Sequence, residues 1–92
     1  VETKEQEIMV ILQEECAEVI QAVSKCIRFG IDNTYSKGSG SQRQNLVKEL
    51  GDLQCMINLC VEHDIVAMDD IKNAILNKQD KLKIYSKIYN KD

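Results

Sequence analysis

The sequence predicts an all-α protein, an antiparallel bundle of three to four helices. Two observations carry this prediction: the 92 residues contain no proline, and apolar side chains recur every three or four positions along the chain. The length is that of one small domain, so we expect a single domain over residues 1–92. A domain of this size buries only a little over about 60% of its unfolded-chain surface, which favours completion of the bundle by dimerisation.

The first helix is expected over roughly residues 4–28. Gly30 follows as a stop, because glycine is the usual residue just past a helix end. The polar stretch from about residue 31 to 41 shows no periodicity and predicts a flexible loop. Most helix–helix connections take about 2–8 residues, so this longer loop is a candidate for a functional role. The apolar face of the helix consists of Ile8, Ile11, Leu12, Cys16, Val19, Val23 and Cys26.

Two further helices are expected after the loop. The second, over roughly residues 42–62, has an apolar sector too wide for a one-sided surface helix, which indicates burial on more than one side. The third, over about residues 70–89, is expected to be N-capped by Asp69 or Asp70. A short extra turn around residues 64–68 would make a fourth helical element. The apolar sector of the second helix comprises Leu46, Val47, Leu50, Leu53, Met56, Ile57, Leu59, Cys60 and Val61.

Composition excludes several classes of protein. The 12 basic and 15 acidic residues give a net charge of −3, without the basic footprint of a nucleic-acid binder. No apolar run reaches the roughly 18–20 residues needed to cross a bilayer. His63 is the single histidine, and the cysteines form no C-x-x-C, so a zinc site has no ligand pattern. We therefore expect a soluble cytoplasmic protein, with neither nucleic acid nor membrane as a partner. Its four cysteines are expected to be reduced: Cys16, Cys26, Cys55 and Cys60.

Two pairs of carboxylates do not fit a plain bundle. Glu15 and Glu18 are three residues apart on the first helix, and Glu49 and Asp52 have the same spacing on the second, so each pair lies on one helix face. Glu15 and Glu49 fall inside the apolar stripes of their helices. Since an unpaired buried carboxylate is costly, something must neutralise these groups. A solvated face balanced by lysines of the third helix is one solution, and a divalent cation is the more complete one.

The donor set favours a particular kind of metal. Carboxylate oxygens without thiolate or imidazole partners suit Mg²⁺ or Mn²⁺ rather than zinc or copper. A di-iron bundle would need Glu-x-x-His on two helices, and an EF-hand needs a D-x-D-x-D-G loop; the sequence has neither. The mirrored pairs therefore indicate a magnesium-type site.

The same residues resemble a known family. The segment Glu14-Glu15-Cys16-Ala17-Glu18 followed by Glu49-Leu50-Gly51-Asp52 is similar to the E-E-x-x-E…E-x-x-D motif of MazG-like all-α nucleotide pyrophosphohydrolases, and the resemblance covers about residues 8–85. It implies that Mg²⁺, with Mn²⁺ as a possible substitute, is held by four carboxylates: Glu15, Glu18, Glu49 and Asp52.

The resemblance also implies roles for other residues. Glu14 would support the metal ligands or orient the attacking water, and Glu14 or Glu18 would take its proton. Lys78 and Lys81 are candidates for contacts with the phosphates, although Ile84 stands where the family usually has an arginine. Lys25 is a weaker phosphate candidate, because a cation near a helix C-terminus is stabilised there in any case.

The implied activity is Mg²⁺-dependent hydrolysis of (deoxy)nucleoside triphosphates to monophosphate and pyrophosphate, in the service of nucleotide-pool housecleaning. The implied assembly is a homodimer or a dimer of dimers. Within the same fold, a phosphoribosyl-ATP or a dUTP/dCTP-selective pyrophosphohydrolase would share the carboxylates. The alternative from a different class is a non-enzymatic helical interaction or regulatory module whose acids merely balance its lysines.

Overall fold

The computed structural model describes residues 3–34, 38 and 40–90. Three helices make up this part of the chain: α1 (Lys4–Phe29), α2 (Gln42–Glu62) and α3 (Met68–Tyr85). The described residues contain no β-strand, and a single antiparallel bridge joins Thr34 to Ser41. The all-α prediction is confirmed. No helix in the described ranges has the length and apolarity that crossing a membrane requires.

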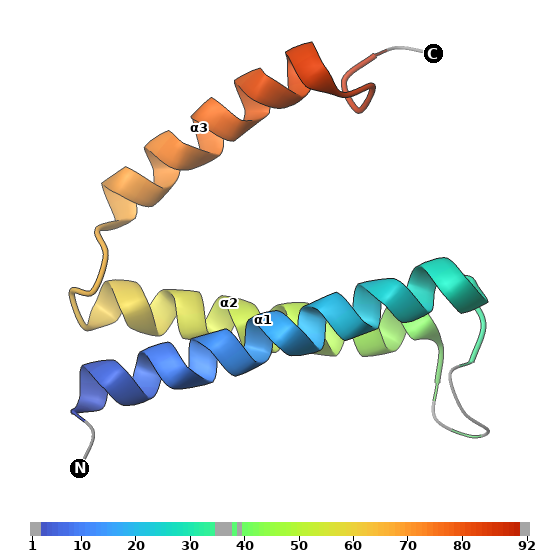
Figure 1. Ribbon diagram of the computed structural model, residues 1–92, viewed down its shortest axis with the longest axis horizontal. Helices are drawn as coiled ribbons and strands as arrows, with labels where there is room; N and C mark the ends of the chain where they lie inside the picture. The colour runs from blue at the N-terminus through green and yellow to red at the C-terminus, as the bar shows by residue number, and fades with distance from the viewer. Residues whose placement is uncertain (1–2, 35–37, 39, 91–92) are drawn as a thin grey trace.

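α1 and α2 form an antiparallel hairpin, in which they lie side by side along most of their length (Figure 1). Both helices begin with a capping box, in which Thr3 pairs with Gln6 and Ser41 with Gln44. These reciprocal side-chain bonds satisfy backbone N–H groups that have no partner within the helix. Gly30 ends α1 at a φ of 90°, a conformation that glycine adopts without strain, so the predicted stop is confirmed.

The described part of the connection is tied to both helices. The backbone N–H of Gln42 donates to the carbonyl of Asn33 at 2.8 Å, and that of Arg43 donates to the carbonyl of Ile31 at 2.8 Å. The side-chain amide of Asn33 donates to the carbonyl of Phe29. The predicted flexible loop also spans residues 35–37 and 39, which lie outside the described residues.

The third helix differs from its prediction at both ends. It begins after Ala67, which makes no side-chain capping bond, and Asp69 and Asp70 lie in its first turn. Carboxylates there are favoured by the helix dipole, so they help the helix without capping it. It ends at Tyr85 rather than at residue 89, because the Ser86 hydroxyl donates to the carbonyl of Leu82 at 2.7 Å while its backbone is extended. Such local bonds compete with continuation of a helix.

The connection between α2 and α3 contains no further helix. Residues 63–66 form a turn and a bend, in which Asp64 has a φ of 59°. His63 caps the C-terminal end of α2. Of the three or four helices predicted, three are present in the described ranges.

Most of the packing among the described residues lies within the hairpin. Its core is small, with Ile8 of α1 against Met56 and Cys60 of α2. α3 diverges from the hairpin towards its C-terminal end (Figure 1), and none of its residues is buried. The molecule is correspondingly flat, with extents of 40 × 38 × 15 Å. A closed bundle is therefore not completed within one chain.

Candidate metal centre

Three carboxylates converge midway along the hairpin. Glu15 comes from α1, and Glu49 and Asp52 come from α2; one oxygen of each lies within 4.8 Å of the others. The two residues of α2 are three positions apart, so their side chains leave the same face of the helix. The antiparallel pairing of the helices then sets Glu15 opposite them. The carboxylate cluster is defined by these three residues.

Burial sets the energetics of the carboxylate cluster. Glu49 is only 6% exposed, whereas Glu15 and Asp52 are half-buried. Removal from water raises the pKa of Glu15 above its ordinary value, and the neighbouring carboxylates of Asp52 and Glu49 raise that pKa further. The cluster is thus a place where negative charge is held at a cost, and where a cation would be stabilised.

Lys48 supplies a positive charge at the edge of the cluster. Its Nζ donates to Oε1 of Glu49 at 2.9 Å and to Oδ2 of Asp52 at 2.9 Å. These hydrogen bonds raise the pKa of Lys48 above its ordinary value, so the ammonium group stays charged. One positive charge against three carboxylates leaves a formal excess of two negative charges (3 − 1 = 2) when all three are ionised.

Lys48 is not among the residues that the sequence predicted for the site. In the absence of a metal, lysines of the third helix were expected to neutralise the carboxylates. The lysine that forms ion pairs with Glu49 and Asp52 lies instead on α2 itself. The signal was available, because Lys48 and Asp52 are four residues apart, a spacing at which opposite charges meet on a helix.

The donor set of the cluster fits a hard divalent cation. All three groups offer carboxylate oxygens, which Mg²⁺ and Mn²⁺ prefer. Oxygens bound to one Mg²⁺ at about 2.0–2.1 Å lie at most about 4.2 Å apart. Adjacent ligands of an octahedral ion lie closer still, at about 3 Å, so the three oxygens, now within 4.8 Å, would have to approach one another by up to about 2 Å to ligate one Mg²⁺.

The other two predicted carboxylates lie outside the cluster. Glu18 is exposed, yet it lies close enough to Glu15 to contribute to the raised pKa of that residue. Glu14 is also exposed, one residue before Glu15 on α1. Both therefore face water next to the cluster, and their roles stay predictions.

The predicted phosphate contacts are not brought to the cluster within one chain. Lys78 and Lys81 are exposed on α3, the helix that diverges from the hairpin (Figure 1). Lys25 is half-buried near the C-terminal end of α1, about 15 Å along the helix axis from Glu15 at 1.5 Å per residue. Any contact between Lys78 or Lys81 and a nucleotide bound at the cluster therefore requires either a movement of α3 or a second chain.

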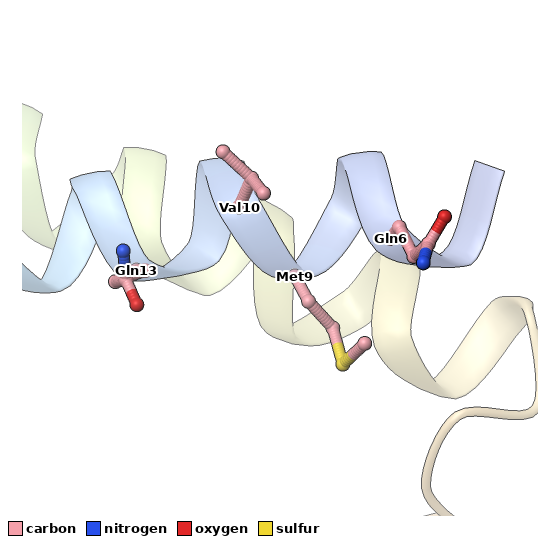
Figure 2. Close-up of a pocket in the computed structure, with 4 residues that line it drawn as sticks. All are labelled: Gln6, Met9, Val10 and Gln13. Atoms are coloured by element: carbon pink, nitrogen blue, oxygen red, sulfur yellow. The ribbon is translucent and has the colours of Figure 1, made fainter. Parts of the chain in front are cut away.

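Two hollows on the described part of the hairpin lie away from the carboxylate cluster. One, of about 290 Å³, is formed on α1 by uncharged side chains (Figure 2): Gln6, Met9, Val10 and Gln13. Another, of about 340 Å³, lies between the N-terminal half of α1 and the C-terminal half of α2, with an apolar floor that includes Ile8, Ile11, Met56 and Leu59. Neither of these two hollows includes a cluster residue.

Comparison with protein families matches residues 3–83 to the MazG nucleotide pyrophosphohydrolase domain. The match spans the hairpin, the cluster and almost all of α3. No curated protein matches the chain, and no solved structure does.

Proposed function

Because the chain belongs to the MazG nucleotide pyrophosphohydrolase family, we propose that it hydrolyses ribo- or deoxyribonucleoside triphosphates to the monophosphate and pyrophosphate. We further propose that the reaction depends on Mg²⁺, for which Mn²⁺ can substitute, and that it serves housecleaning of the nucleotide pool. The observation that carries the proposal is the carboxylate cluster shared by α1 and α2, with its excess of negative charge.

The ligands of the proposed site are Glu15, Glu49 and Asp52, joined by Glu18 from the exposed side. A divalent cation bound there would neutralise charge on the phosphates and lower the pKa of a bound water. Without such a cation, three carboxylates would repel a triphosphate. The cluster is thus useful for this chemistry only when a cation outweighs its own charge.

Proton transfer falls to the exposed carboxylates. Glu18 or Glu14 accepts a proton from the attacking water, since both face solvent beside the cluster. The water oxygen forms a bond to the α-phosphorus as the bond from that phosphorus to the bridging oxygen breaks. The electron pair of that bond leaves with pyrophosphate. The negative charge of the pyrophosphate is proposed to be bound by three lysines: Lys78, Lys81 and Lys25.

A second chain completes the molecule in this proposal, as a homodimer or a dimer of dimers. The accessible surface is 7328 Å², against about 5,400 Å² for a compact monomer of this mass. The excess, about 1,900 Å², is more than the roughly 800 Å² that each partner buries in a standard interface. The exposed surface includes large apolar side chains, among them Ile20, Ile27, Val47, Leu76 and Ile84.

The remaining expectations are part of the proposal. We propose one domain over residues 1–92, acting in the cytoplasm without a nucleic-acid partner. The four cysteines are free thiols, which supports a reducing compartment. The net charge of −3 supports the absence of a nucleic-acid partner.

A non-enzymatic interaction module is the second candidate. It is favoured by the ion pairs of Lys48 with Glu49 and Asp52, which already offset part of the acidic charge. The exposed apolar surface would then serve partner binding alone. This candidate predicts that neither chelators nor nucleotides change the behaviour of the protein.

A nucleotide panel separates the candidates. The protein is incubated with Mg²⁺ and each of the common NTPs and dNTPs, with dUTP, dCTP and phosphoribosyl-ATP included for the selective alternatives. We expect release of pyrophosphate rather than orthophosphate from at least one nucleotide, and loss of that release in EDTA. Orthophosphate as the first product, or no turnover of any nucleotide, would contradict the proposal; thermal stability indifferent to Mg²⁺ plus nucleotide would then support the module.

A further inference from the structure

We propose that Lys48 is the internal counter-cation of the carboxylate cluster, and that a divalent cation must displace its ammonium group in order to bind. Lys48 then sets the metal affinity of the site and keeps its ligands together when no metal is present. This inference rests on the proposed function, because it concerns the same site.

The position of the ammonium group is the first argument. Nζ of Lys48 lies 2.9 Å from an oxygen of Glu49 and 2.9 Å from an oxygen of Asp52. Both residues also belong to the set whose oxygens approach one another within 4.8 Å. A divalent cation ligated by the same carboxylates would share their oxygens with the ammonium group at close range, where the two positive charges repel.

The mobility of the lysine is the second argument. The Lys48 side chain is 67% exposed, and its long aliphatic stem lets the charged head turn into water without movement of the helix. The pair with Asp52 is exposed on both sides, and such lysine–carboxylate pairs are individually weak. A doubly charged ion with three carboxylate ligands therefore displaces the ammonium group, although the loss of the ion pairs of Lys48 weakens its binding.

The geometry of the metal-free site is the third argument. Three carboxylates within 4.8 Å repel one another, and Glu49 cannot turn away into water because it is buried. Lys48 offsets that repulsion by bridging the two carboxylates of α2. Its removal should therefore make the metal-free protein less stable while making the metal bind more tightly.

The test compares Lys48→Met with a matched control, Lys83→Met. Lys83 has a similar exposure, 61%, and a similar short-range partner, with Nζ 3.8 Å from Asp80, but it lies on α3. Mn²⁺ affinity is measured by calorimetry at one pH and low ionic strength, and thermal unfolding is recorded in EDTA and in saturating Mn²⁺. Helix content from circular dichroism confirms that each variant folds.

We expect Lys48→Met to bind Mn²⁺ at least about fivefold more tightly than the unaltered protein. Its unfolding temperature in EDTA should fall, and the rise caused by Mn²⁺ should be larger. Lys83→Met should stay within about twofold of the unaltered protein in affinity. If the unaltered protein binds Mn²⁺ and Lys48→Met binds it equally or less tightly, the role of Lys48 is overturned while the metal centre stands. If the unaltered protein does not bind Mn²⁺, the metal centre and the proposed function fail with it.

Discussion

At the residue scale, the chain places carboxylates where a two-helix hairpin would ordinarily pack apolar side chains. Glu49 is as well buried as the core residues Ile8 and Met56. Burial of an ionised carboxylate without a partner lowers the free energy of unfolding by roughly several kcal/mol. Lys48 pairs with it from an exposed position, and a metal ion would pair with it more completely. The residues of the cluster are therefore poor choices for stability and suitable ones for binding a cation.

The raised pKa of Glu15 makes the metal-free protein sensitive to pH. A carboxyl whose pKa is higher in the folded than in the unfolded chain binds more protons when the chain is folded. Its contribution to stability is therefore full below the ordinary pKa of 4.5, and it is lost as the pH rises through the raised pKa. Glu15→Gln cannot ionise and should keep that stability at neutral pH. We expect its unfolding temperature in EDTA to exceed that of the unaltered protein at pH 7 and to converge with it towards pH 4.

Thermal unfolding between pH 4 and 8 checks this prediction, with Glu14→Gln as a matched change at an exposed neighbour on the same helix. Saturating Mn²⁺ should reverse the order at pH 7, since only the ionised carboxylate of Glu15 can ligate. Equal pH profiles for Glu15→Gln and the unaltered protein would show that the position of Glu15 in the cluster has no energetic consequence.

Asp52→Asn tests a proposed ligand directly. The amide keeps the size of the side chain but removes a charge from the cluster. Mn²⁺ affinity and the rate of pyrophosphate release should therefore each fall by at least about 100-fold. Losses of up to about this size follow even from substitution of groups that only hydrogen-bond to a metal ligand. Asp80→Asn, at an exposed position of α3, should change either quantity by less than about twofold. A variant at Asp52 that retains a tenth or more of the activity would remove this residue from the site.

At the element scale, the helix ends show what local sequence can predict. The predicted bounds of α1 and α2 agree with the structure to within one residue, because Gly30 and the polar loop mark these ends locally. The end of α3 was predicted four residues too late. Its termination depends on which way the Ser86 hydroxyl points, and the apolar periodicity that continues to Ile88 gives no sign of it.

The first residue of α2 carries a testable anomaly. The Gln42 side chain is fully buried, and neither its amide nitrogen nor its oxygen has a hydrogen-bond partner. An unsatisfied buried amide costs about 1–3 kcal/mol, whereas an apolar group of the same shape does not. Gln42→Met should therefore raise the free energy of unfolding by about 1–2 kcal/mol, measured by urea denaturation.

Gln54→Met is the matched control for Gln42→Met, since it makes the same change at an exposed position of the same helix. A surface substitution of this kind should stay within about 0.5 kcal/mol. A loss of stability in Gln42→Met would mean that the amide is bonded in the folded protein and that its burial is not a defect.

At the scale of the whole molecule, the single chain is too open to be complete. Its radius of gyration is 16.3 Å, against about 12 Å for a compact domain of this length. α3 exposes most of its large apolar residues, with Ile84 at 72%. The wide apolar sector of α2 predicted from the sequence is likewise left partly uncovered, at Val47 and Leu50. The direction of α3 could not be predicted, because it depends on packing beyond the local pattern.

Sedimentation of the protein tests the proposed assembly. We expect a mass of about 21 kDa for a dimer or about 42 kDa for a dimer of dimers, as multiples of the 10.5 kDa chain. Ile84→Asp places a charge on the exposed apolar side of α3 and should shift the equilibrium towards the monomer, whereas Asn73→Asp, at an exposed polar position of the same helix, should not. A 10.5 kDa species at tens of micromolar protein would contradict the dimer.

The sequence identified the cluster and left its neutralisation open. Glu15, Glu49 and Asp52 were predicted because their spacing and place in the apolar stripes are local properties of two helices. The ion pairs of Lys48 were not predicted, although Lys48 and Asp52 are four residues apart on one helix. The separation of Glu18 from the other three carboxylates depends on how α1 is rotated against α2, which periodicity does not resolve to the width of one side chain.

The most direct test of the metal centre is a crystal structure with Mn²⁺ and a triphosphate analogue whose α,β-bridging atom resists hydrolysis. We predict an anomalous scattering peak at about 2.0–2.2 Å from carboxylate oxygens of Glu15, Glu49 and Asp52, with the α-phosphate beside it. Manganese bound elsewhere, with the three carboxylates still bridged only by Lys48, would contradict the account.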